Sequence, residues 1–214
     1  MKYESYLFDF DGVIVDSMPY YLAAMIKILD DEGVKYGNDL VKIIAPLGYL
    51  GTAVYYKKEY GITMDEEEMV TLMKKYAYES YAHHIPAKAN VIDTLKKLRE
   101  SGAEVNILTA SPHAVVDVCM QRLGITDFFG NVWSTDDFGR SKTDPKIYEE
   151  AAERIGRPID EILFLDDNYF NVKTAAGAGM KVCGVYDRTS EDLAEEIKAA
   201  SDHYVKDMKE LLEI

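Results

Sequence analysis

The sequence predicts an α/β fold, a Rossmann-like doubly wound parallel sheet that carries an inserted α-helical cap domain. Two observations predict the sheet: short apolar runs of strand length recur along the chain, and helical patterns that end at a glycine separate them. A third predicts the insertion, because the stretch after the first run has helical periodicity and no convincing strand. We expect residues 1–15 and 87–214 to form the sheet domain and residues 16–86 to form the cap.

The expected strands are apolar runs that stop at polar residues or glycine, as buried parallel strands do. They span residues 6–10, 105–108, 131–133, 162–165 and 182–185, of which the third is the weakest. Apolar side chains at helical spacing fill three of the gaps, with faces that begin at Val91, Val115 and Ile147. Strands that alternate with helices in this way form βαβ units in one parallel sheet.

The inserted segment is rich in tyrosine and holds ten of the 16 tyrosines of the chain. Packing between the cap helices and the sheet domain is the ordinary role of such rings, and lining of a substrate pocket is the alternative. An acidic run at residues 65–68 marks a helix start, and Pro86 is the expected return hinge.

Composition excludes several classes of partner. The chain has 24 Lys and Arg against 38 Asp and Glu, a formal charge of −14 at pH 7, which repels nucleic acids and anionic membranes.

Its two cysteines lie in apolar stretches, so we expect no disulfide framework. No signal-peptide pattern or membrane-spanning apolar stretch is present in the sequence. We expect a cytoplasmic protein that is a monomer or weak homodimer.

Polar residues follow four of the expected strands, at the edge where open parallel sheets bind their ligands. They are Asp9 and Asp11 after the first strand, Thr109 and Ser111 after the second, Lys142 after the third, and Asp166 and Asp167 after the fourth. Two aspartate pairs at one edge repel each other unless a cation lies between them, and Mg²⁺ suits a site of few carboxylates. Lys142 and the Thr109 hydroxyl suit a bound phosphoryl group.

Four segments resemble the motifs of the haloacid dehalogenase (HAD) superfamily, in the same order and across essentially the whole chain. They are DFDGVIVDS at residues 9–17, ILTAS at 107–111, KTDPKIY at 142–148 and FLDDN at 164–168. The insert is similar to the cap of the subgroup that contains phosphoglycolate phosphatases and β-phosphoglucomutase. The resemblance implies a phosphatase that uses Mg²⁺ and acts on a small phosphorylated metabolite.

The resemblance also implies catalytic roles for the first pair of aspartates. Asp9 is the implied nucleophile, whose carboxylate attacks phosphorus to give an aspartyl-phosphate. Asp11 is the implied general acid and base, which protonates the leaving oxygen and later accepts a proton from water. A spacing of two on a continuing strand predicts that both side chains lie on one face.

Metal and phosphate ligands follow from the same resemblance. Mg²⁺ is implied at Asp9, the backbone carbonyl of Asp11 and Asp167, with Asp166 as a direct or water-mediated ligand. The implied phosphate-binding groups are the Thr109 hydroxyl, the Ala110 amide and the Lys142 ammonium.

Asp11 separates the activities within the superfamily. Dehalogenases have an aromatic residue at this position and phosphonatases a small one, so phosphoryl transfer is favoured. A β-phosphoglucomutase is the main alternative, but it has a His five residues after the position of Asp16, where this chain has Tyr21, and an arginine in the cap, whereas residues 17–85 contain none. A noncatalytic protein of the same fold is disfavoured because all the acids are present. Sugar phosphates, phosphoglycolate and nucleoside monophosphates remain open as substrates.

Overall fold

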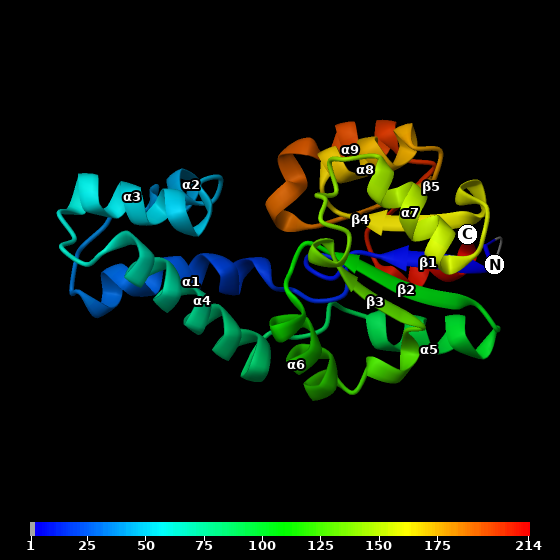
Figure 1. Cartoon of the computed structure of the whole chain (residues 1–214), viewed down its shortest axis with the longest axis horizontal. Helices are drawn as coiled ribbons and strands as arrows, with labels where there is room; N and C mark the ends of the chain where they lie inside the picture. Colours follow the sequence, from blue (N-terminus) through cyan, green and yellow to red (C-terminus); the bar gives the residue numbers. More distant parts are fainter. Residues whose placement is uncertain (1–2) are drawn as a thin grey trace. The chain divides into compact units, whose positions relative to one another are not determined.

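The computed structural model describes residues 3–214. The chain divides into two compact units (Figure 1). One contains the residues up to Asp16 together with Pro86–Ile214, and the other is the segment Ser17–Ile85. Each boundary of the inserted unit lies one residue inside the expected range of 16–86.

The first unit is built on a six-stranded parallel sheet in the order β3-β2-β1-β4-β5-β6. The strands are β1 Ser5–Phe8, β2 Glu104–Thr109, β3 Asn131–Ser134, β4 Ile162–Asp166, β5 Lys181–Val185 and β6 His203–Val205. β1 lies between β2 and β4 and is buried along its whole length, which explains its continuous apolar run. The predicted Rossmann-like sheet is confirmed. The sixth strand was not predicted, because its three residues include the half-buried His203 and Tyr204 and form no apolar run.

Helices cover both faces of this sheet (Figure 1). One face carries α5 Val91–Glu100 and α6 His113–Leu123, and the other carries α7 Lys146–Ile155, α8 Tyr169–Gly177 and α9 Ala194–Ala200. The chain steps from β1 to β3 in one direction and from β4 to β6 in the other, so right-handed crossovers place the two sets of helices on opposite faces. A doubly wound sheet of this kind has one topological switch point, where the strand order reverses, and here it lies between β1 and β4.

The core of the sheet unit includes a cluster that joins the sheet to α7 and α8. Leu7 and Phe164 from the strands pack with Ile147, Tyr148 and Val172 from these helices, and all five are fully buried. Both cysteines of the chain are buried free thiols, as the sequence predicts. Within residues 3–214, none of the helices combines the length and the apolar composition that a membrane crossing requires.

The inserted unit is helical, as predicted, with α1 Met18–Asp31, α2 Leu40–Ile44, α3 Gly48–Tyr60 and α4 Glu66–His83. Asp65 accepts a hydrogen bond from the backbone N–H of Glu67 and so caps α4. The unit has a core of its own, in which Met25, Met69 and Tyr56 are buried. Five more tyrosines pack around this core: Tyr21, Tyr49, Tyr55, Tyr60 and Tyr76. Packing within the cap itself therefore accounts for most of its tyrosines.

Candidate active site

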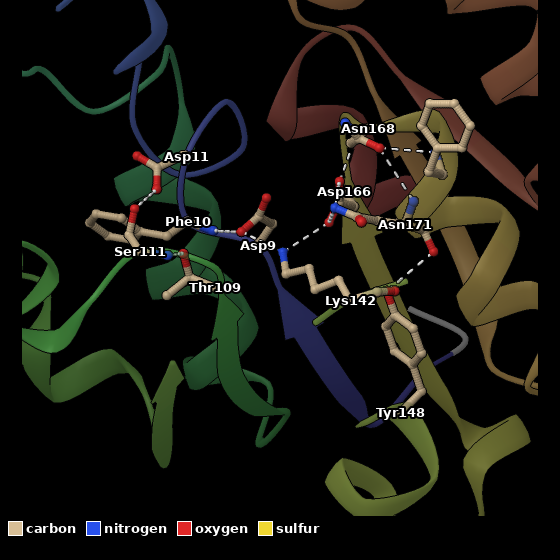
Figure 2. Close-up of polar contacts among 11 residues, drawn as sticks. Asp9, Phe10, Asp11, Thr109, Ser111, Lys142, Tyr148, Asp166, Asn168 and Asn171 are labelled. Carbon is tan, nitrogen blue, oxygen red and sulfur yellow. Dashed lines mark hydrogen bonds and ion pairs between the residues drawn. The ribbon is translucent and has the colours of Figure 1, made fainter. Parts of the chain in front are cut away.

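The predicted polar residues meet at the carboxyl edge of the central strands. Phe8, the last residue of β1, pairs with Ile107 of β2 and Leu165 of β4. This register brings Asp9 level with the end of β4, where its backbone N–H donates to the Leu165 carbonyl at 2.8 Å. Figure 2 shows the side chains that gather around Asp9.

Lys142 lies between two carboxylates. Its Nζ is 2.6 Å from Asp9 Oδ1 and 3.0 Å from Asp166 Oδ2, and only 3% of its side chain is exposed (Figure 2). The Tyr148 hydroxyl donates to the Lys142 carbonyl at 2.9 Å, and Lys142 Nζ lies 5.6 Å from the centre of the Phe164 ring. Hydrogen bonds and ion pairs thus fix both the backbone and the ammonium group of Lys142, and its positive charge lies against the Asp9 and Asp166 carboxylates.

Asp166 is buried and accepts hydrogen bonds on both of its oxygens. Oδ1 accepts from the Asn168 N–H at 2.8 Å, and the Asn171 amide reaches both oxygens at 3.1 and 3.3 Å (Figure 2). With Lys142 on Oδ2, the carboxylate is well supplied with donors and positions the lysine. Asn171 was not identified from the sequence. It lies in the first turn of α8, and no motif in that segment distinguishes it from other polar residues.

Three carboxylates form an acidic cluster. Among the described residues, Asp9, Asp166 and Asp167 each place one oxygen so that the three lie within 4.8 Å of one another. Burial raises the pKa of Asp9 to about 7, against the opposing attraction of Lys142. Burial also raises the pKa of Asp167 well above its ordinary value, and the charges of Asp166 and Asp9 add to the rise. A hard divalent cation fits such a cluster, because it would favour the ionised form of each carboxylate.

The charge state of Lys142 follows from the same neighbours. Burial lowers the pKa of Lys142, but the attraction of Asp166 and Asp9 outweighs burial, and the pKa lies above its ordinary value. Lys142 therefore stays positively charged at neutral pH and offsets part of the negative charge of the cluster.

The Asp11 side chain points away from that of Asp9, because the strand that was predicted to continue through both residues ends before them (Figure 2). β1 ends at Phe8, and the chain then turns, with the Ile14 and Val15 N–H groups donating to the Phe10 carbonyl. Figure 2 shows Asp9 directed toward Lys142 and Asp11 directed toward Ser111, whose hydroxyl donates to Asp11 Oδ2 at 2.6 Å. Asp11 remains near enough for its charge to contribute to the raised pKa of Asp9.

The two predicted phosphate-binding groups of the second strand lie at the end of β2. Thr109 is buried, and its hydroxyl oxygen accepts from the Ser111 N–H at 3.0 Å. As an acceptor in this bond, the hydroxyl keeps its own proton to donate. Ala110 follows directly and is exposed. Phosphate binding by these residues and Lys142 stays a prediction.

Comparison with known proteins places the chain in a family. A family model described as haloacid dehalogenase-like hydrolase matches residues 6–185, a range that contains all four sequence motifs. Pyrophosphatase PpaX of Bacillus velezensis is 28% identical over 182 residues, which cover 84% of this chain and 81% of that protein.

Two solved structures show the same fold. A protein of Haemophilus somnus, predicted to be a phosphoglycolate phosphatase, aligns with a TM-score of 0.81 at 20% identity over 100% of this chain and 98% of its own. A protein of Thermotoga maritima, assigned as a β-phosphoglucomutase, aligns with a TM-score of 0.85 at 20% identity over 98% and 97%. The chain belongs to the haloacid dehalogenase-like hydrolase family.

Proposed function

We propose that the protein is a Mg²⁺-dependent phosphatase that hydrolyses a small phosphomonoester through an aspartyl-phosphate on Asp9. One observation carries the proposal: Asp9, the residue directly after the central strand β1, lies within an acidic cluster and in contact with the buried cation of Lys142. The names of the relatives, a pyrophosphatase and a phosphoglycolate phosphatase, support phosphoryl chemistry at this edge.

The contacts of the side chains support a role for each of them. The Asp9 carboxylate attacks phosphorus, and Lys142 orients that carboxylate and offsets its charge. Asp11 donates a proton to the leaving oxygen and later accepts one from the attacking water, while the Ser111 hydroxyl holds its carboxylate in place. The Thr109 hydroxyl has a proton available for an oxygen of the transferring group.

The acidic cluster fits a magnesium site. Asp9 and Asp167, with the backbone carbonyl of Asp11, would hold the ion, and the donors already on Asp166 favour an indirect role for that carboxylate. Bound Mg²⁺ would supply positive charge for the approach of an anionic phosphate to an anionic nucleophile.

Hydrolysis is favoured over the mutase reaction by two features of the cap. Tyr21 stands where the mutase resemblance requires a His, and its ring packs against Tyr49 with 4.9 Å between ring centres. Residues 17–85 contain no arginine to hold a second phosphate. Water is then the acceptor of the phosphoryl group, and inorganic phosphate is the product.

The test is phosphate release from a panel of phosphomonoesters and pyrophosphate, with Mg²⁺ and with excess EDTA. We expect Mg²⁺-dependent turnover that Asp9→Asn abolishes and that the control Asp160→Asn, an exposed aspartate at the opposite end of the sheet, leaves intact. Reduction of the working enzyme with borohydride should convert the aspartyl-phosphate to homoserine, which peptide mass spectrometry locates at position 9. Full activity of Asp9→Asn, or full activity in EDTA, contradicts the proposal.

A second measurement separates hydrolysis from the mutase reaction. The enzyme is given β-glucose 1-phosphate together with the 1,6-bisphosphate, and glucose 6-phosphate and inorganic phosphate are both followed. We expect no net isomer formation. Isomer formation faster than phosphate release would establish the mutase instead.

A further inference from the structure

Lys88, outside the predicted site, uses its full capacity for hydrogen bonds. Its Nζ lies 2.6 Å from the Gly12 carbonyl, 2.8 Å from the Tyr186 carbonyl and 2.9 Å from Asp187 Oδ2. An ammonium group has three N–H donors, so each has one acceptor. The side chain is only 21% exposed, and Asp187 is 6% exposed.

One of these acceptors belongs to the loop that carries the catalytic acids. Gly12 follows Asp11 directly and has a φ of +74°, in the region that favours glycine. A Cβ at this position would lie 2.7 Å from the Asp167 carboxylate. The backbone at Gly12 thus packs directly against a carboxylate of the acidic cluster. A donor that holds the Gly12 carbonyl, as Lys88 does, therefore also influences the distance between this loop and Asp167.

The segment that carries Lys88 is paired with the rest of the same loop. The Asp16 N–H donates to the Pro86 carbonyl at 3.0 Å, and the Lys88 N–H donates to the Ile14 carbonyl at 2.9 Å. Val15 and Ala87 form an antiparallel bridge between these two bonds. Lys88 therefore approaches Gly12 from a backbone that is already fixed to the loop.

Asp187 is held independently of Lys88. Its other oxygen accepts from the Thr189 N–H at 2.9 Å and from the Thr189 hydroxyl at 2.6 Å. The carboxylate is thereby fixed in the loop after β5 and presents its second oxygen to Lys88. The lysine joins three segments: the loop after β1, the segment that follows the cap and the loop after β5.

We propose that Lys88 is a positioning residue that holds the loop of Asp9, Asp11 and Gly12 against Asp167 and thereby sets the affinity of the acidic cluster for Mg²⁺. Asp187 is the counter-ion that directs Lys88 at the Gly12 carbonyl. This inference rests on the proposed function, because it assigns Lys88 a role in the magnesium site proposed there.

A purely electrostatic role and a positioning role for Lys88 predict opposite changes in Mg²⁺ affinity when the lysine is replaced. The direction of the measured change therefore distinguishes the two roles. Lys88 is a cation close enough to Asp167 for its charge to act on that carboxylate, and its removal leaves Asp187 without its cationic partner. The local charge becomes more negative, so a purely electrostatic effect would tighten the binding of Mg²⁺. A positioning role predicts weaker binding, because the ligands would no longer be held at the spacing that the ion requires.

The first experiment is calorimetric titration of Mg²⁺ into the protein of 214 residues without substrate. Lys88→Met keeps most of the side-chain length and removes all three donors, and we expect it to weaken Mg²⁺ binding by roughly tenfold or more. Lys88→Arg restores donors and should recover part of the affinity. The control is Lys181→Met, which removes a lysine paired with Asp202 at 3.3 Å at the start of β5 and should leave the affinity unchanged. Unchanged or tighter binding by Lys88→Met would overturn the inference.

A second readout requires no metal. Amide hydrogen exchange is measured at Gly12, Ile14 and Val15, whose N–H groups donate within the loop. We expect Lys88→Met to speed their exchange by about fivefold, the equivalent of one net hydrogen bond, and to leave β4 unchanged. Should Lys88→Met fail to fold, Asp187→Asn keeps the lysine and is expected to show the same changes to a smaller degree. A wild-type protein that binds no Mg²⁺ would defeat the proposed metal site, whereas unchanged loop exchange in the variants would defeat the positioning role.

Discussion

Replacing Lys142 with Met removes the side-chain cation that contacts both Asp9 and Asp166. Methionine has a similar length and retains the contact with the Phe164 ring, so the change is mainly electrostatic. The lysine lies 2.6 and 3.0 Å from two carboxylates that are 11% and 0% exposed. Breaking a buried ion pair by removing one partner costs about 3–5 kcal/mol. We expect a loss of this size in the free energy of unfolding, together with loss of turnover.

The loss should depend on pH in a direction set by Asp9. Burial raises the pKa of Asp9 from 3.8 to about 7, so the native state retains a proton that the unfolded state has released. A carboxyl group of this kind lowers stability as the pH rises between these values. Lys142 opposes the rise, so its removal moves the pKa of Asp9 further upward. The deficit of Lys142→Met should therefore be smallest near pH 5 and increase toward pH 8.

The assay is urea unfolding of the wild type and the variant in EDTA at several pH values. Lys146→Met, which removes an exposed lysine of the same motif, is the matched control and should change stability by less than about 0.5 kcal/mol. A Lys142→Met protein as stable as the control near pH 8, or one whose deficit shrinks as the pH rises, refutes the electrostatic reasoning.

Three further predictions concern other parts of the site and its surroundings. Asp11→Asn should slow the hydrolysis of alkyl phosphates far more than that of p-nitrophenyl phosphate, because a stable leaving group needs little help from a general acid; equal losses for the two substrates would argue against that role. Gly12→Ala should lower both the free energy of unfolding and the Mg²⁺ affinity, because residue 12 has a φ of +74° and its new Cβ would lie 2.7 Å from Asp167. Wild-type values of both quantities, measured by urea unfolding and calorimetry, would contradict the close packing. The hydrogen bond to Asp137 raises the pKa of His113 above 6.5, so its contribution to stability is complete below that pH and is lost as the pH rises through the folded value. His113→Gln should then cost up to about 1 kcal/mol in urea unfolding near pH 5.5 and less near pH 8.5, and a deficit that grows with pH would show that the pair does not act in this way.

The sequence by itself was sufficient for the fold class and for the membership of most of the candidate site. β1, β2 and β4 are central and buried, so their residues form apolar runs that stand out from the amphipathic helices. A polar residue after each run marks the carboxyl end of a parallel strand, where ligands bind. Asp9, Lys142 and Asp166 were found in this way, and the structure places them in direct contact.

The contacts themselves were decided by the tertiary structure. The end of β1 was invisible in the sequence, because Phe10 continues the apolar run although the strand stops at Phe8. The side chains of Asp9 and Asp11 point in different directions as a result. The short, half-buried β6 had no periodic signal of its own. Its position depends on the neighbouring β5 rather than on local preference.

The residues that support the site were also beyond the reach of the sequence. Lys88 and Asp187 lie 99 positions apart, and Asn171 reaches Asp166 from the following helix. Each is an ordinary polar residue in its own segment, with no motif to distinguish it. Their partners are selected by strand register and loop packing, which bring distant backbone carbonyls and carboxylates within hydrogen-bonding distance only when the whole sheet has formed.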